Sequence, residues 1–327
     1  MTTPLQFEQQ YESEWAELER ALEQIRRGRL SKAAVTDVQG ERVAALYRRA
    51  CEHLAIARAR AYPAFLLDRL EQLTATAHQV IYQRREFGLD AASRLALVEF
   101  PRRVRENAAY VWTAAAVFLL PALVVGCLVY SRPELILSVV SAETAASFDE
   151  MYAPGAQSIG RRRTADTDWM MFGFYIRNNV GIAFQCFAAG LFAGVGSLFF
   201  LAANGAFGGA IAGYLTARGL SSTFYSFVVT HSAFELTAII LAGAAGLRIG
   251  HALLAPGRRR RVQSLVEAAR EMSVIIYGVT AMLFIAAAVE AFWSSAGWLP
   301  PSVKYGVAAV CWTGVLGYFT LQGRRAG

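Results

Sequence analysis

The chain has 327 residues, of which 55% are hydrophobic, and its mean hydropathy is +0.33. A soluble globular protein of this length is rarely so apolar, so the composition indicates a chain that is partly water-soluble and partly membrane-embedded. The net charge of +7 could suit nucleic acid, but the arginines cluster beside apolar runs, as they do at the cytoplasmic ends of membrane helices. Nucleic acid is therefore excluded as an expected partner.

The N-terminal stretch MTTPLQFEQQYESEWAELER is acidic and polar. It lacks the pattern of a cleavable signal peptide, so we expect the first segment to stay in the cytoplasm. The four cysteines form no C-x-x-C pair, and three of them lie in apolar runs, which argues against a disulfide framework or a zinc ribbon. The chain also has no P-loop, no G-x-S-x-G and no dinucleotide fingerprint after a strand, so nothing indicates a soluble enzyme.

Residues 1–106 are predicted to form a cytoplasmic bundle of amphipathic helices. The second helix should run from about Arg42 to Ala61, and the third should begin near Phe65 and be closed by Gly88. We expect His53 and His78 at the surface or at the edge of the core, and not as ligands. The buried face of the first helix is predicted from residues that recur at steps of three and four: Phe7, Tyr11, Trp15, Leu18, Leu22 and Ile25.

Residues 107–327 are predicted to form a transmembrane helical domain of about six spans, which makes the chain an all-α, polytopic membrane protein. Residues 131–175 should be an external loop, with one or two helices lying along the membrane surface. The arginine clusters place both termini in the cytoplasm, beneath the inner or plasma membrane. The spans are expected at about 110–130, 174–203, 223–253, 274–293 and 303–321, with a glycine-rich segment at 204–219 that either crosses or is re-entrant.

Glycines spaced by four occur in three of these segments, for example at Gly205, Gly209 and Gly213. Small residues at this spacing let helix backbones approach closely in lipid. We therefore predict a closely packed bundle, and we expect such faces to favour homo-oligomers.

The polar residues within the predicted spans are few. Counting about 1.5 Å per residue from the predicted span ends places them in the outer half of the bilayer, whereas Asn204 falls at the opposite end. Glu235 lies too deep to reach water easily, so it should face the interior and either be neutral or pair with His231, one helical turn away. We predict a functional polar cluster made of Asn178, Asn179, His231, Glu235 and Glu290.

Three interpretations of this cluster remain open. The first is an interhelical hydrogen-bonded knot, and the second is a pathway for protons or substrate. The third is a metal site in which His231, Glu235 and Glu290 bind zinc and leave one position open. The cluster contains only one histidine, and the zinc-binding motif H-E-x-x-H is missing. We therefore expect no cofactor, with zinc as the alternative.

Several stretches together cover nearly the whole chain in a recognisable order. They are LYRRACEHLAIARAR, LTATAHQVIY, EFPRRVREN, IRNNVGIAF, LAANGAFGGAIAGYL, THSAFELTAIILAGAAGLRIG and VEAFWS. In this series the chain resembles the stage II sporulation protein M family, in its wider branch with an N-terminal cytoplasmic helical domain. Thr230 and Ser232 flank the histidine where that branch often has proline and glycine, which softens the helix break expected there.

The resemblance implies an integral membrane protein and supplies no catalytic residues. The namesake anchors and organises peptidoglycan-degrading partners in sporulating cells, and wider members tend to be encoded near MoxR-type ATPases. The expected function is thus a non-enzymatic scaffold or component of a cell-envelope complex, in contact with membrane lipid, envelope proteins and a cytoplasmic ATPase. The alternatives are a transporter or permease with an outward-facing polar cavity, and an intramembrane zinc hydrolase.

Overall fold

The computed structural model describes residues 3–26, 38–82, 89–154 and 167–324. In these ranges every regular element is helical, which confirms the all-α prediction. The chain divides into two compact units, residues 1–90 and 91–327. Each unit has a hydrophobic core of its own.

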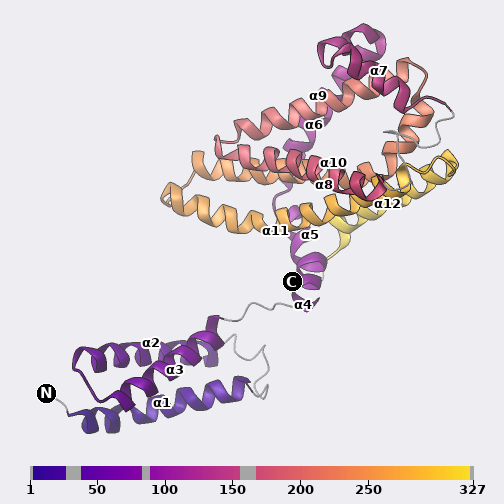
Figure 1. The fold of residues 1–327 in the computed structure, drawn as a ribbon. Helices are drawn as coiled ribbons and strands as arrows, with labels where there is room; N and C mark the ends of the chain where they lie inside the picture. Colours follow the sequence, from indigo (N-terminus) through magenta and orange to yellow (C-terminus); the bar gives the residue numbers. More distant parts are fainter. Residues whose placement is uncertain (1–2, 27–37, 83–88, 155–166, 325–327) are drawn as a thin grey trace. The chain divides into compact units, whose positions relative to one another are not determined.

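The first unit contains three long helices, α1 (Pro4–Arg26), α2 (Val38–Ala59) and α3 (Ala64–Tyr82) (Figure 1). The predicted face of α1 is confirmed: Phe7, Trp15, Leu18 and Leu22 are buried, and Tyr11 packs against them. The opposite face carries the charges, as the helical period requires. Leu46, Ala50 and Ala57 of α2 and Leu66, Leu70, Leu73 and Ala77 of α3 complete the core.

His53 lies inside this core, so its predicted place at the surface or core edge is wrong. Its side chain is only 5% exposed, and the indole Nε1 of Trp15 donates to its Nδ1 at 3.1 Å. The ring also packs against Tyr11, with 4.0 Å between centroids. An aromatic pocket thus supplies both packing and a donor, which the helical period alone does not reveal. Burial lowers the pKa of His53 below its usual value. His78 is near the surface and hydrogen-bonds Tyr47.

The second unit is built around six long helices. They are α6 (Ala108–Ser131), α8 (Asp168–Ala188), α9 (Val195–Ala217), α10 (Ser221–Leu254), α11 (Arg261–Ala288) and α12 (Pro301–Leu321). The shorter elements are α4 (Leu89–Arg94), η2 (Leu95–Glu99), α5 (Phe100–Glu106), η3 (Pro133–Ser138), α7 (Ala142–Met151), η5 (Ala189–Leu191) and η6 (Val289–Ser294). Helix α10 packs against all five other long helices and is the centre of the unit (Figure 1).

Four helical segments of the described residues are long and apolar enough to cross a membrane: α6, α9, α10, and α11 continued by η6. Helices α8 and α12 have 21 residues each but do not reach the same apolarity. The membrane bundle is therefore confirmed, whereas the count of about six spans is not.

The predicted second span, 174–203, is wrong. Helix α8 ends at Ala188, and the chain turns through η5 before α9 begins at Val195. Ala193 and Gly194 make the turn with positive φ angles of 54° and 82°. The apolar sequence runs on through this turn, so hydropathy alone does not mark it. The glycine-rich segment is consequently the second half of a full 23-residue helix. The predicted external loop is also too long, because residues 168–175 belong to α8.

Helices α6 and α9 approach each other so closely that larger residues do not fit between them. A Cβ atom on Gly205 would lie 2.0 Å from the carbonyl oxygen of Phe118, and one on Gly209 would lie 2.0 Å from that of Ala122. The other two glycine sets meet each other, since a Cβ on Gly190 would lie 2.2 Å from the carbonyl oxygen of Gly246. The predicted close packing is confirmed, and it joins helices of one chain.

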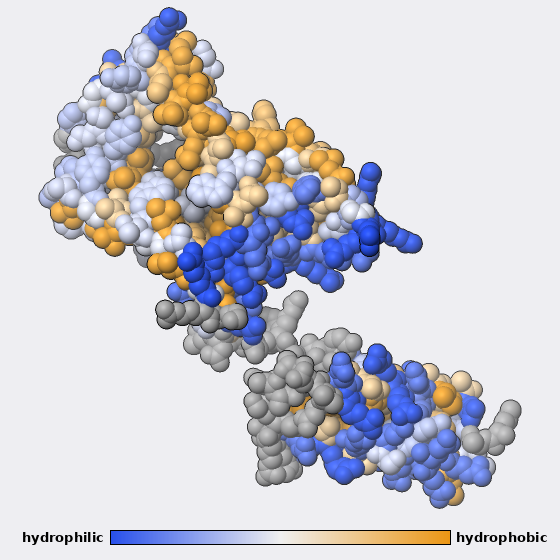
Figure 2. All heavy atoms as spheres, turned by 180° about the vertical axis from the view of Figure 1, so that it is seen from behind, coloured by the Kyte–Doolittle hydropathy of each residue, from blue (hydrophilic) through white to orange (hydrophobic). Residues whose placement is uncertain are grey.

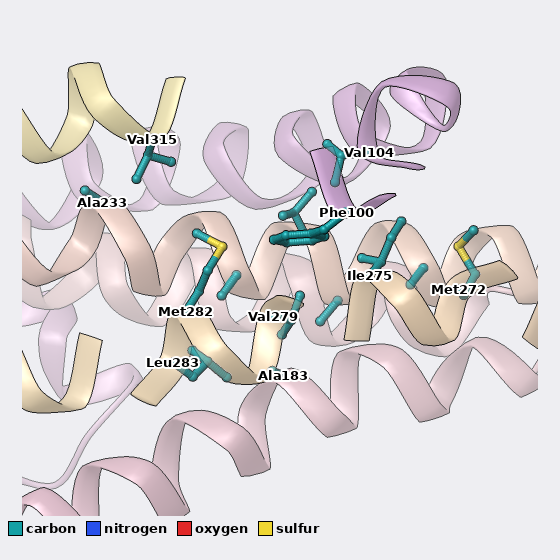
Figure 3. Close-up of a cluster of buried hydrophobic side chains, with 14 of the residues drawn as sticks. Phe100, Val104, Ala183, Ala233, Met272, Ile275, Val279, Met282, Leu283 and Val315 are labelled. Atoms are coloured by element: carbon teal, nitrogen blue, oxygen red, sulfur yellow. The ribbon is translucent and has the colours of Figure 1, made fainter. Parts of the chain in front are cut away.

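The core next to α10 includes α5, a helix that the sequence assigns to the cytoplasmic domain. Phe100 and Val104 of α5 are buried beside Met272, Ile275 and Val279 of α11 (Figure 3). Gly278 lies directly against the Phe100 ring: a Cβ atom on Gly278 would be only 2.4 Å from the ring carbons. Hydrophobic residues gather over much of the second unit on the face in Figure 2, whereas the first unit is mostly hydrophilic there.

Candidate functional site

Polar side chains from three elements of the second unit meet in one cluster. Helix α8 contributes Asn179, α10 contributes His231 and Glu235, and η6 contributes Glu290. The structure therefore brings together four of the five residues predicted for the cluster. One ligand atom from each of His231, Glu235 and Glu290 lies within 4.8 Å of the others.

His231 and Glu235 share a face of α10 because they are four residues apart on a helix. His231 is 5% exposed, and its Nδ1 lies 3.0 Å from the hydroxyl oxygen of Ser294 on η6. Its Nε2 faces the Glu235 carboxylate at 3.9 Å, which is too long for a hydrogen bond. The ring is also held edge-on to Phe227, one turn earlier, with centroids 5.4 Å apart. Both sides of the imidazole are thus fixed by neighbours.

The two asparagines of α8 have different surroundings. Asn179 is 2% exposed, and its side chain faces the Glu235 carboxylate. Its Nδ2 is buried and has no hydrogen bond of ordinary geometry. Asn178 is exposed and donates to Asn179 Oδ1 at 2.9 Å. Asn178 therefore reaches the cluster only through its neighbour.

Glu290 lies on the π-helical segment η6 and is 9% exposed. Single π turns inside longer helices often occur at functional sites. Tyr152, which follows α7, is also buried near Glu290. Its pKa is raised above the usual value, chiefly by burial and further by the Glu290 charge. The phenol is therefore a proton donor and not an anion at neutral pH.

A lysine that the sequence analysis did not select is the most deeply buried charge of the site. Lys304 of α12 is 0% exposed, and its Nζ donates to the main-chain carbonyl oxygen of Ser294 at 2.7 Å. The Thr230 hydroxyl in turn donates to the Lys304 carbonyl oxygen at 3.3 Å, just before His231. Helix α12 is thus joined to both α10 and η6 around the cluster.

The sequence analysis did not select three residues of the site: Ser294, Lys304 and Tyr152. Only Lys304 could have been recognised from the sequence. Lys304 is one of two lysines among 32 basic residues, and it stands at the start of an apolar run. Ser294 and Tyr152 resemble ordinary loop-end residues, and only the folded chain brings them near His231. Asn204, which was expected to lie apart from the cluster, donates to the carbonyl oxygen of Phe200 in its own helix at 2.7 Å.

The arrangement combines two carboxyl groups, one imidazole and one amine in a space shielded from solvent. Such groups can tie helices together by hydrogen bonds, because unpaired polar atoms are costly inside a membrane. The three ligand atoms of His231, Glu235 and Glu290 can also approach a common cation.

Long apolar helices around a buried polar cluster define a polytopic α-helical membrane protein. The family model of stage II sporulation protein M matches residues 115–295, more than half of the chain, and the protein belongs to that family. Residues 5–83 match a second model, described as a domain of unknown function (DUF8413). No curated protein and no solved structure matches the chain.

Proposed function

We propose that the protein is a non-enzymatic membrane component of a cell-envelope complex, in which residues 1–90 dock a cytoplasmic partner. The observation that carries this proposal is the division into two compact units with separate cores. Among the described residues, the candidate spans all lie in the second unit. A small helical bundle attached to a membrane anchor is suited to recruiting another protein to the membrane surface.

The charges at one end of the membrane unit support a cytoplasmic location for this bundle. Arg103 of α5 lies 3.7 Å from Glu271 of α11, and Arg248 of α10 lies 3.3 Å from the same carboxylate. Arg105 donates to the carbonyl oxygen of Phe319 near the end of α12. The arginine-rich helix α5, which directly precedes α6, and the ends of α10 and α12 therefore lie on one side. By the positive-inside rule that side faces the cytoplasm of the inner or plasma membrane.

The surface of the bundle offers a place for docking. Phe65 and Leu5 are 60% and 65% exposed, which is high for large apolar side chains in a small water-soluble unit. The partner proposed from the family resemblance is a MoxR-type ATPase, and the envelope proteins would be held by the membrane unit. In this arrangement the polar cluster fixes the relative positions of α8, α10, η6 and α12.

The test measures binding of the MoxR-type ATPase of the same organism to the purified full-length chain in lipid nanodiscs. The proposal predicts saturable binding that Phe65→Ser weakens at least tenfold. Val262→Ser, at an apolar position of α11 that is 72% exposed, is the matched control and should bind normally. Binding that is undetectable, or equal in the two variants, would reject the docking role. Solute flux through the chain in sealed liposomes would instead favour a transporter.

A further inference from the structure

We propose that His231, Glu235 and Glu290 form a binding site for one divalent transition-metal ion, and Zn²⁺ is the probe. The proposal goes beyond the docking role and depends only on the second unit. The ligands come from α10 and η6, so a bound ion would add a second link between two elements that the His231–Ser294 hydrogen bond already joins.

The spacing of the ligand atoms fits one ion better than a direct bond. Nε2 of His231 and Oε2 of Glu235 are 3.9 Å apart, beyond hydrogen-bond distance. Zinc binds nitrogen and oxygen at about 2.0–2.2 Å, so two ligands of a tetrahedral site lie roughly 3.3 Å apart. All three ligand atoms already lie within 4.8 Å of one another. Small side-chain rotations would close the site.

The neighbours of the ligands are arranged as outer-shell partners. Ser294 engages Nδ1 of His231 at 3.0 Å and leaves Nε2 to face the carboxylates. A metal-bound histidine usually has its other nitrogen held in this way. A second observation is Asn179: it is 2% exposed, its amide faces Glu235, and its Nδ2 makes no hydrogen bond of ordinary geometry. This amide is placed to hold the Glu235 carboxylate from outside the site.

The donor set selects the class of ion. One imidazole with two carboxylates suits zinc and neighbouring transition metals better than Ca²⁺ or Mg²⁺, which prefer oxygen ligands alone. Two carboxylates also balance the charge of a divalent ion in a largely buried place. Lys304 stays bonded to the Ser294 carbonyl oxygen and is not a ligand. Three protein ligands leave one tetrahedral position for water.

The experiment uses the full-length chain, purified in detergent with a tag that contains no histidine, stripped with chelator and titrated with Zn²⁺. Metal per chain is measured by mass spectrometry, and Co²⁺ is used in parallel for its visible absorption. We expect about one ion per chain, with at least 100-fold weaker binding for His231→Gln and 10- to 100-fold weaker binding for Ser294→Ala. His251→Gln is the control, because His251 lies at the other end of α10 beside Tyr110.

Two results would overturn the proposal: a wild-type chain that stays metal-free at micromolar Zn²⁺, or a His231→Gln chain that binds as the wild type does. The three variants and the wild type all keep the four cysteines, so adventitious binding of zinc by thiols would be the same in every protein compared. Size-exclusion profiles report folding. Where His231→Gln aggregates, Ser294→Ala replaces it, and unchanged affinity then counts against the site.

Discussion

The amine of Lys304 donates a 2.7 Å hydrogen bond to the carbonyl oxygen of Ser294, and no part of the lysine side chain reaches solvent. Ser294 ends the π-helical segment η6, and its carbonyl oxygen belongs to the last turn. A cation near the C-terminal end of a helix satisfies carbonyl groups and interacts favourably with the helix dipole. This bond therefore holds the end of η6 against α12, the helix that follows it.

Replacing Lys304 with methionine keeps the length of the side chain and removes the donor. The Ser294 carbonyl oxygen would lose this partner in a shielded place, which costs about 1–3 kcal/mol. We expect the thermal unfolding midpoint of the detergent-solubilised protein to fall. Val303→Ala, at the neighbouring position that is 44% exposed, is the control. Equal midpoints in Lys304→Met and the wild type would show that the bond contributes nothing.

Adjacent glycines of α9 provide a matched pair for testing the packing against α6. Gly209→Ala would place a methyl group 2.0 Å from the carbonyl oxygen of Ala122, whereas nothing lies within 4 Å of a Cβ on Gly208. Gly209→Ala should separate the two helices and lower the unfolding midpoint by several degrees. Gly208→Ala should leave it unchanged or raise it slightly, since alanine favours helix. Similar midpoints for both variants would contradict the close approach.

Glu271 of α11 bridges Arg248 of α10 and Arg103 of α5 at 3.3 and 3.7 Å. These side chains are partly exposed, so each pair should contribute only about 0.2–1 kcal/mol. Glu271→Gln should therefore leave the membrane bundle folded and increase hydrogen exchange in α5. Glu267→Gln is the control, because Glu267 pairs with Arg259 and not with α5. Unchanged exchange in α5 would mean that hydrophobic contacts alone hold this helix.

The helical bundle of the first unit should lose stability as the pH falls. The pKa of His53 is lowered in the folded state by burial, and its Nδ1 already accepts from Trp15. The unfolded chain therefore binds a proton at higher pH than the folded one. Stability from this group is complete above about pH 6.5 and declines as the pH falls toward the lowered value.

The measurement is hydrogen exchange in α1–α3 of the full-length chain at pH 7.5 and 5.5, corrected for the intrinsic rate. The wild type should open more readily at the lower pH, and His53→Asn should reduce this difference. His78→Gln removes a histidine nearer the surface of the same bundle and serves as the comparison. A difference that persists in full in His53→Asn would assign the effect to other groups.

The sequence predicts the elements with strong periodicity. The spacing of Phe7, Trp15 and Leu18 fixed one face of α1, and the apolar length of 110–130 located α6 within a few residues. The turn at Gly194 escaped prediction because its exposed side chains are themselves apolar, as Leu191, Phe192 and Val195 show, so hydropathy does not mark it. In the site, His231 and Glu235 were found because they share one helix face. Lys304 was missed because its partners lie on elements that only tertiary packing brings near.

The position of α10 at the centre of the bundle has a consequence for biosynthesis. Helices α6, α8 and α9 leave the ribosome before α10 and can cover one side of it. Asn179 of α8 is made before Glu235, but two other partners come later: Ser294 follows His231 by more than sixty residues, and Lys304, whose carbonyl oxygen accepts from Thr230, by more than seventy. His231 and Glu235 are therefore synthesised before η6 and α12, which complete their shielding. In the growing chain these two polar side chains are incompletely shielded, and the shielding is complete only after α12 has been inserted.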